Sequence, residues 1–440
     1  MKRRFHVETY GCQMNAYDSQ VMVGLLERAG WEAVADPEAA DLILVNTCAV
    51  REHAERRVLG RLNQLAGLRR RREAPLVLGV VGCMAQRLGE ELVAATGGRV
   101  DLVVGPDQYD RLPALAESAL APGEALVCTE RDHGAVYRAK PRTAPPGGSH
   151  FVAVMRGCDN YCSYCVVPYT RGRERSKPWR QVLDEVTDLA ARGAFEVVLL
   201  GQTVSNYRDG DVDLAGLLER LHDVPGLQSL RFLTSYPTDA SERLLRTIAA
   251  LPKAGTELHL PFQAGSDRIL AAMNRRYTVA GYEAVLDRAR ALVPDVTFTT
   301  DIIVGFPGET EDDFAGTLGV VERQGFASAF TFKYSTRAGT RAARVEDDVP
   351  LAVKEERLAR LNALQSRKTR QLLESQLGRT LEIVLDEPSK KRETQLRGRC
   401  RNNLRVIVDR APGLELGTRV RARVHAIAGT SLLGTLAGEA

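Results

Sequence analysis

Strand-like apolar runs alternate with helical patterns over most of the chain, and this alternation limits the possible folds more than any other feature. In residues 1–140 the apolar runs Phe5–Thr9, Leu42–Asn46 and Leu76–Val81 are each followed by a turn and a helical pattern such as Ala16–Ala29. Strands that alternate with helices pair in parallel, and the helices cover the sheet. Residues 1–140 therefore predict a parallel α/β domain.

Residues 145–375 repeat the same unit and predict a second α/β domain. Helical patterns, among them Trp179–Arg192 and Glu311–Arg323, separate six strand-like runs: Phe151–Arg156, Glu196–Gly201, Ser229–Ser235, Glu257–Pro261, Thr297–Val304 and Ala327–Tyr334. Six parallel strands fit either an open sheet or an incomplete barrel, and periodicity alone does not choose between them. The Pro- and Gly-rich stretch Ala139–Ser149 is expected to be the linker before this domain.

Residues 376–440 change character after a long amphipathic helical pattern, Val353–Leu377. Short alternating runs separated by turn residues predict a small antiparallel β-barrel. The runs are Leu381–Leu385, Leu404–Val408, Arg419–Val424 and Leu433–Leu436. Arg419, Arg421 and Arg423 alternate with apolar residues, which places the three guanidinium groups on one face of a strand. This segment has 12 Lys and Arg against 7 Asp and Glu, a balance of +5 in a chain of net charge +4. It is where a nucleic-acid contact is sought first.

Composition excludes several classes of protein. With 440 residues and 44% hydrophobic residues the chain is neither disordered nor fibrous. No apolar run approaches the ~18–20 residues of a membrane helix, and the start of the chain has no signal-peptide pattern. We therefore expect a cytoplasmic protein without a membrane anchor. In that reducing compartment the eight cysteines are not expected to form disulfides.

Three cysteines, Cys12, Cys48 and Cys83, each follow one of the N-terminal strand-like runs. The carboxyl ends of parallel strands meet at one edge of a sheet, where open α/β folds place their ligands. The three thiols can therefore converge. Separate packing of each cysteine in the core is an equal alternative, because free cysteine packs well in protein interiors.

A second set, Cys158, Cys162 and Cys165, lies within eight residues on the loop after the first strand of the second domain. Three thiolates at this spacing can ligate three irons of a [4Fe-4S] cluster, and one iron stays open because no fourth cysteine is within reach of the loop. A structural zinc site is less favoured, since such sites normally have four ligands in paired blocks. Cys128 and Cys400 match no ligand position and are expected to be packing residues.

The three-cysteine motif, with the aromatic Tyr164 directly before its last cysteine, resembles that of the radical S-adenosylmethionine (SAM) superfamily. The resemblance implies a radical SAM (βα)6 partial barrel, in which the open iron binds SAM and Tyr164 packs against the adenine. Gly305 and Gly308 resemble the glycine-containing segment that lines the adenosine, although an ordinary strand-to-helix turn is an alternative. Gln202 occupies a position that contacts the methionine part of SAM in superfamily members.

Nearly the whole chain is similar to the methylthiotransferases. The segments that carry the resemblance are Thr9–Asn15, Asn46–Cys48, Gly82–Cys83, Val167–Arg173, Leu258–Ser266 and the C-terminal barrel. The family implies an N-terminal cluster domain (1–140), a radical SAM core (145–375) and a TRAM domain (376–440). It also implies a second [4Fe-4S] cluster on Cys12, Cys48 and Cys83. Beyond the cluster ligands, no catalytic residue is assigned.

Within the family, Gly11–Asn15 and Val167–Gly172 most resemble the branch that acts on N6-dimethylallyladenosine in tRNA. The implied reaction replaces the C2 hydrogen of that nucleoside, next to the anticodon, with a methylthio group, and SAM is both methyl donor and radical source. The implied partners are the tRNA anticodon stem-loop, whose unpaired bases can be splayed into a pocket, and an electron donor such as a flavodoxin or ferredoxin. A monomer is expected.

Two other functions are weighed against this one. The first is a methylthiotransferase that acts on threonylcarbamoyladenosine in tRNA or on a ribosomal protein. The second is a non-catalytic RNA-binding protein in which both cysteine sets are structural metal sites.

Overall fold

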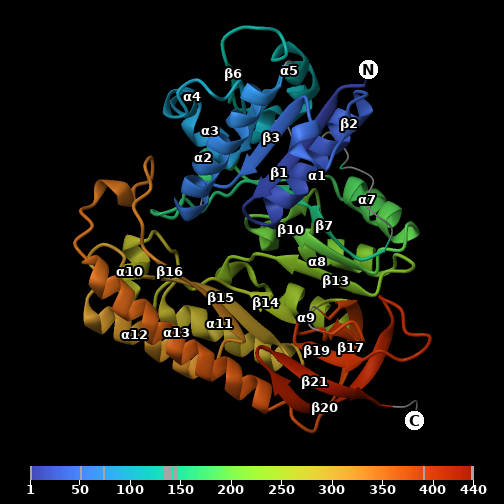
Figure 1. The fold of residues 1–440 in the computed structure, drawn as a ribbon. Helices are drawn as coiled ribbons and strands as arrows, with labels where there is room; N and C mark the ends of the chain where they lie inside the picture. The colour runs from blue at the N-terminus through green and yellow to red at the C-terminus, as the bar shows by residue number, and fades with distance from the viewer. Residues whose placement is uncertain are drawn as a thin grey trace. The chain divides into compact units, whose positions relative to one another are not determined.

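The computed structural model describes residues 2–49, 52–72, 75–132, 141, 147–389 and 392–437 (Figure 1). Most of the predicted linker Ala139–Ser149 lies outside these residues. The chain forms two compact units. The first unit comprises residues 1–144, 155–161 and 165–177, and the second comprises residues 145–154, 162–164 and 178–440.

The first unit contains a six-stranded parallel sheet of order β2-β1-β3-β4-β5-β6. Its strands are β1 (Arg4–Tyr10), β2 (Glu32–Ala33), β3 (Leu42–Thr47), β4 (Val77–Gly82), β5 (Leu102–Val104) and β6 (Leu126–Cys128). The predicted parallel α/β domain is confirmed. The sequence pattern missed β2, β5 and β6, because strands of two or three residues carry no periodicity of their own.

Both faces of this sheet are covered by helices, which explains the continuous apolar strands. In β3, Leu42 and Leu44 pack with one buried cluster, whereas Ile43 and Val45 pack with another on the opposite face. The helices are α1 (Gln13–Arg28), α2 (Glu52–Gly67), α3 (Cys83–Leu88), α4 (Glu90–Ala95) and α5 (Leu112–Ser118).

Two further segments complete the first unit. β8 (Met155–Arg156) pairs in antiparallel fashion with β9 (Arg175–Ser176), and α6 (Val167–Arg171) lies between them in the chain. The prediction of one continuous strand over Phe151–Arg156 is therefore wrong. The parallel strand β7 ends at Ala153, and the next residues pair with a different partner.

The second unit contains the repeated βα core. Its strands β7 (Ser149–Ala153), β10 (Glu196–Leu200) and β13 (Ser229–Leu233) form one parallel sheet, and β14 (Glu257–His259), β15 (Thr297–Val304) and β16 (Ser328–Lys333) form another. A parallel bridge pairs Leu230 of β13 with Ala254, which lies shortly before β14 in the chain. Since no pairing joins β7 to β16 among the described strands, the six strands form the expected open partial barrel.

Helices follow the strands of this core: α7 (Trp179–Ala191), α8 (Leu214–His222), α9 (Glu242–Ala250), α10 (Asp267–Ala272), α11 (Val279–Leu292) and α12 (Glu311–Gln324). One large buried cluster unites strand residues such as Leu199, Phe232 and Ile302 with helix residues such as Leu245 and Leu286. In the part of the chain that the structure describes, no helix is long and apolar enough to cross a membrane.

The helix α13 (Leu351–Glu374) leads to a closed five-stranded barrel of order β17-β18-β19-β21-β20, drawn in red in Figure 1. Its strands are β17 (Thr380–Pro388), β18 (Gln395–Arg399), β19 (Arg405–Asp409), β20 (Arg419–Ala428) and β21 (Ser431–Leu436). The predicted barrel is confirmed with two corrections. The pair β19–β21 is parallel, and β18 was missed because polar residues and Gly398 interrupt its apolar pattern.

Candidate functional site

The three N-terminal cysteines lie at the carboxyl edge of the first sheet. Cys12 is the N-cap of α1, Cys48 follows β3, and Cys83 is the first residue of α3 directly after β4. The register pairs Tyr10 with Thr47 and Thr47 with Gly82, so the three strands end level with one another. The predicted convergence of these strand ends is confirmed, whereas the role of the cysteines as cluster ligands stays a prediction.

The surroundings of these cysteines shift the pKa values of Cys12 and Cys83 in opposite directions. A hydrogen bond with Cys48 and the positive charge of Arg171 lower the pKa of the Cys12 thiol to about 6. Burial raises the pKa of Cys83, while Arg171 opposes that effect. Gly11 allows the close approach, because a Cβ at this position would lie 2.9 Å from the Cβ of Cys48, and its φ is +150°.

Two buried asparagines support this edge of the sheet. Asn15 Nδ2 donates to Asn46 Oδ1 at 2.9 Å, and Asn46 Nδ2 donates to the carbonyl of Asn15 at 2.8 Å. Both belong to the segments that carry the family resemblance, but the sequence alone assigned them no role. Their amide pair fixes the start of α1 against the end of β3 and thereby places Cys12 beside Cys48.

The loop that carries Cys158, Cys162 and Cys165 begins after β8 and ends at α6. Gly157 has a φ of +85°, and a Cβ there would lie 1.9 Å from the carbonyl oxygen of Arg173. The amide of Cys158 donates to the carbonyl of Gly172 at 3.1 Å. Only glycine at position 157 therefore allows the start of the loop to lie against the segment after α6.

Nitrogen donors reach the sulfurs of two cysteines of this loop. Asn160 Nδ2 lies 3.4 Å from the sulfur of Cys158, and Arg275 Nη1 lies 3.5 Å from the sulfur of Cys162, which is buried. Arg275 is itself buried and donates to the carbonyl of Pro261 at 2.6 Å. No sequence pattern indicated Arg275, because it lies 113 positions from Cys162.

Tyr164 packs against a buried cluster that includes Met273, Phe306 and Tyr334. The neighbouring Ser163 is held by the carbonyl groups of Ala272 and Met273, at 2.8 and 2.9 Å. This segment is therefore fixed within the second unit. Contact of Tyr164 with an adenine stays a prediction, as does the role of Gln202, which follows β10 at the carboxyl edge of its sheet.

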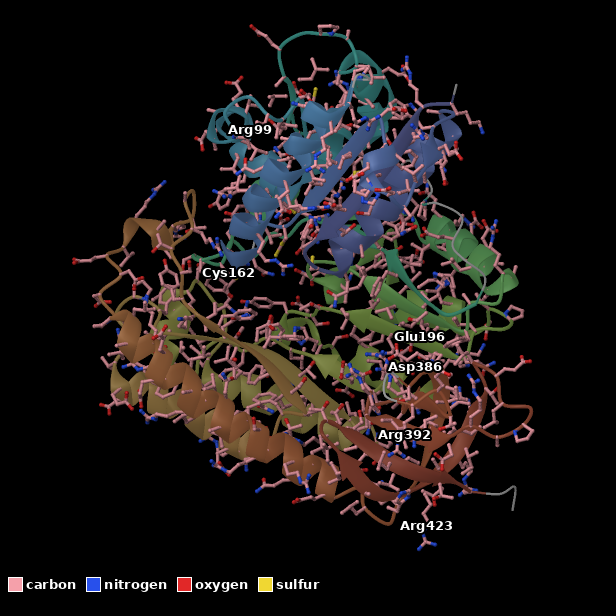
Figure 2. The ribbon with its side chains drawn as sticks, in the orientation of Figure 1. Arg99, Cys162, Glu196, Asp386, Arg392 and Arg423 are labelled. Carbon is pink, nitrogen blue, oxygen red and sulfur yellow. The ribbon has the colours of Figure 1, made fainter. Side chains whose placement is uncertain are left out.

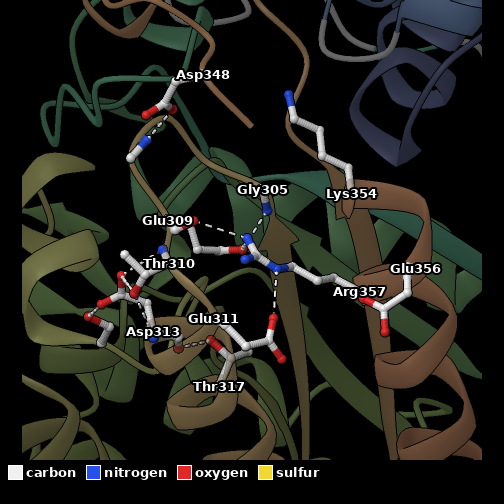
Figure 3. A network of polar contacts seen from close by, with 12 residues as sticks. Gly305, Glu309, Thr310, Glu311, Asp313, Thr317, Asp348, Lys354, Glu356 and Arg357 are labelled. Carbon is white, nitrogen blue, oxygen red and sulfur yellow. Dashed lines mark hydrogen bonds and ion pairs between the residues drawn. The ribbon is translucent and has the colours of Figure 1, made fainter. Parts of the chain in front are cut away.

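The turn between β15 and α12 is built around a buried ion pair (Figure 3). Arg357 Nη1 donates to Glu309 Oε1 at 2.8 Å, and the same carboxylate oxygen accepts the amide of Gly305 at 2.8 Å. Burial raises the pKa of Glu309, while Gly305 and Arg357 act in the opposite direction. The sequence assigned no role to this pair, because Arg357 lies on α13, outside every motif.

The two glycines of this turn have structural reasons to be glycine. Gly305 has a φ of +68°, and a Cβ there would lie 2.3 Å from Cγ of Lys354. Gly308 has a φ of +78°, and its amide donates to Asp348 Oδ1 at 2.6 Å. Their part in binding adenosine stays a prediction, since the turn itself accounts for both residues.

The chemistry of the two cysteine sets decides which metal group fits them. Among the described residues, no group of three or more His, Cys, Asp or Glu side chains is arranged to hold a metal ion. In a [4Fe-4S] cluster each thiolate binds a different iron, so the ligands stand farther apart than around one ion. Cys12, Cys48 and Cys83 at one sheet edge, with Arg171 beside Cys83, fit such a cluster. Cys158, Cys162 and Cys165 offer the same three thiol donors along one loop. The expected packing roles of Cys128 and Cys400 are confirmed, because both lie in apolar clusters.

Comparison with known proteins agrees with this geometry. Residues 4–105 match the uncharacterized protein family UPF0004, and residues 152–321 match the radical SAM superfamily. A tRNA-2-methylthio-N(6)-dimethylallyladenosine synthase of Burkholderia cenocepacia is 44% identical and covers 94% of this chain and 91% of its own length. That of Thermoanaerobacter pseudethanolicus is 43% identical, with coverage of 91% and 85%.

The chain belongs to the tRNA-2-methylthio-N6-dimethylallyladenosine synthase family. A third synthase, from Bordetella avium, is 41% identical and covers 99% of the chain and 92% of its own length. Among solved structures, the radical SAM methyltransferase TsrM from Kitasatospora setae has a TM-score of 0.55 at 16% identity, with coverage of 78% and 77%. OxsB, a cobalamin-dependent SAM radical enzyme, has a TM-score of 0.52 at 12% identity, with coverage of 82% and 56%. These likenesses confirm the radical SAM fold.

Proposed function

We propose that this protein replaces the C2 hydrogen of N6-dimethylallyladenosine next to the anticodon of tRNA with a methylthio group. The observation that carries the proposal is the presence of two separate cysteine sets in a chain 41–44% identical to synthases of that name. Binding and cleavage of SAM require one cluster with an open iron. The other set, Cys12, Cys48 and Cys83, lies at the edge of its own sheet and supports a separate site for the sulfur.

In this proposal Cys158, Cys162 and Cys165 hold the cluster that binds SAM, and Cys12, Cys48 and Cys83 hold the other. When bound, the clusters and SAM supply the electron transfer, radical and methyl chemistry that a C–H bond without an acidic proton requires. The chain supplies the thiolates and the donors around them. Arg275 donates to the sulfur of Cys162 and Asn160 donates to the sulfur of Cys158, and such hydrogen bonds adjust both ligand orientation and reduction potential.

The proposed substrate is the anticodon stem-loop of tRNA, whose bases are unpaired and accessible without melting a helix. Phosphate contacts position a nucleic acid without reading its sequence. The basic C-terminal barrel would supply such contacts and so position the tRNA. A one-electron donor such as a flavodoxin or ferredoxin, a monomeric state and a cytoplasmic location complete the proposal.

The deciding experiment is mass spectrometry of tRNA nucleosides from a strain that lacks this protein. We expect the methylthio form of dimethylallyladenosine to disappear and its precursor to accumulate. Return of the gene should restore the product, and a gene with Cys162→Ala should not. A missing methylthio group on threonylcarbamoyladenosine instead would place the protein in another branch.

Two assays of the purified protein test the proposal further. Release of 5′-deoxyadenosine from SAM after anaerobic reconstitution excludes a non-catalytic RNA-binding protein. Turnover should also require the dimethylallyl group, because a pocket for that group gains ~25 cal/mol per Å2 of apolar surface buried. Equal turnover on tRNA with and without the group would contradict the proposed substrate.

A further inference from the structure

Arg171 makes a contact with Cys83 that the proposed reaction leaves unexplained. Its guanidinium is nearly fully buried, and Nε lies 3.1 Å from the sulfur of Cys83. On its other side, Nη2 lies 2.7 Å from Oδ2 of Asp18, which is completely buried. A buried arginine is normally neutralised by carboxylates, and here it also approaches a cysteine sulfur.

A network of buried ion pairs lies behind this contact. Arg171 and Arg156 both approach Asp18, at 2.7 and 3.9 Å. Arg156 and Arg175 both approach Asp107, at 3.1 and 3.0 Å. In these contacts each carboxylate is approached by two guanidinium groups. Buried charge is costly unless it is paired, so these contacts fix the guanidinium of Arg171 in the orientation that brings Nε to the sulfur of Cys83.

The same segment ties Arg171 to both cysteine sets. Val166, the residue after Cys165, packs in one buried cluster with Cys83 and with Ala49, the residue after Cys48. The helix α6 then carries Arg171, six residues after Cys165. All of these residues belong to the first unit, so the contact lies inside one compact body.

We propose that Arg171 is a positioning residue for the second cluster. Its guanidinium holds the sulfur of Cys83 toward that cluster and stabilises the more negative, reduced form, and Asp18 fixes the orientation of the guanidinium. The physical basis is general: hydrogen bonds to ligand sulfurs and nearby positive charge raise the reduction potential of an iron–sulfur cluster. The low dielectric of a buried site strengthens the effect. The inference rests on the proposed function in requiring that this cluster exists.

The test uses the full-length chain with Cys158, Cys162 and Cys165 all changed to Ala, so that only the second cluster is formed. In this parent, Arg171→Gln should favour the oxidised cluster at least tenfold, a shift of ~59 mV to lower potential in a one-electron titration followed by electron paramagnetic resonance. Arg171→Lys keeps the charge but loses the planar donor geometry, so its reduction potential should fall between those of the parent and of Arg171→Gln.

The matched control is Arg175→Gln, which removes a guanidinium from the same buried network but not from Cys83. In this control, the ratio of oxidised to reduced cluster at a given applied potential should stay within threefold of the parent. If Arg171→Gln loses the cluster while Arg175→Gln keeps it, the positioning role is also supported. An unchanged potential in Arg171→Gln at full iron content, or loss of the cluster in both variants, overturns the inference. A parent that binds no iron at all contradicts the two-cluster function itself.

Discussion

At the scale of single residues, the two cysteine sets differ in what surrounds them. Cys12 has a pKa of about 6 and lies in a hydrogen bond with Cys48, at the ends of strands far apart in the sequence. Cys158, Cys162 and Cys165 lie on one short loop, and separate donors reach two of them. Because the two environments share no cysteine, we expect the two sets to have separable roles.

Replacement of either set tests this separation. Cys158→Ala, Cys162→Ala or Cys165→Ala should abolish reductive cleavage of SAM, since these thiolates hold the cluster whose open iron binds it. Cys12→Ala, Cys48→Ala or Cys83→Ala should leave cleavage but stop formation of the methylthio product. Each triple variant should contain about four iron atoms per chain instead of roughly eight. Full product yield from the triple variant of the N-terminal set would contradict two separate clusters.

The sequence identified the cysteines but not the residues that act on them. A cysteine triplet is visible as spacing, whereas Arg171, Arg275 and Arg357 look like ordinary surface charges until the fold buries them. Their partners lie 88, 113 and 48 positions away. No local pattern encodes such contacts, so only the structure could reveal them.

At the scale of elements, the turns that present the ligands depend on glycine. Gly157→Ala would place a Cβ 1.9 Å from the carbonyl oxygen of Arg173, at a φ of +85° that L-residues rarely adopt. We expect this variant to lose most of the iron held by the core loop and to retain that of the N-terminal cysteines. Gly98→Ala is the control, because nothing lies within 4 Å of a Cβ there and its φ is also positive. Full iron content in Gly157→Ala would show that the loop can rearrange.

The ion pair between Glu309 and Arg357 should stabilise the turn between β15 and α12. Arg357→Ala leaves a buried carboxylate without its cation, which typically costs ~3–5 kcal/mol. The control is Arg360→Ala, since that half-exposed arginine pairs with exposed Glu311 and should cost at most ~1 kcal/mol. Urea titration of the iron-free proteins measures the loss of unfolding free energy in both variants. Equal midpoints for the two variants would mean that the buried pair adds nothing to stability.

The elements themselves were predictable where they were long and periodic. β3, β4 and β15 are apolar strands bounded by turns, and each was predicted within one residue of its observed ends. β18 and the break after β7 were not predicted, because both depend on which strand each segment pairs with. Gly398 shows this, since a Cβ there would lie 2.9 Å from Cδ1 of Ile383 on the neighbouring strand.

At the scale of the whole molecule, the chain forms two compact units, and neither unit is one continuous stretch of sequence. Residues 155–161 and 165–177 follow the first core strand but pack with the N-terminal unit. Buried contacts between charged residues, such as Arg156 with Asp107 at 3.1 Å, hold them there. Hydrophobic periodicity carries no information about such contacts, so the sequence could not predict that these segments pack with the N-terminal unit.

The C-terminal barrel should contribute tRNA affinity through only two of the three arginines predicted on its basic strand. Arg421 and Arg423 are exposed on β20, and Arg423 points away from the barrel (Figure 2). Arg419 differs, because it pairs with Glu382 and donates to the carbonyl of Gln228 at 2.9 Å. It therefore links the barrel to the core of the same unit and is less available to a phosphate than the sequence predicted.

An Arg421/Arg423→Ala variant should bind tRNA more weakly and with a flatter dependence of log affinity on log salt. Each lost phosphate contact removes ~0.7–0.9 from the slope through counterion release, so the change should reach ~1.5 if both arginines are engaged. Cleavage of SAM should be unaffected, because every assigned ligand lies before residue 310. Arg246→Ala, at an exposed site on α9, controls for loss of one surface charge elsewhere. An unaltered slope in the barrel variant would place the phosphate contacts on another surface, for which exposed Arg173 is the next candidate.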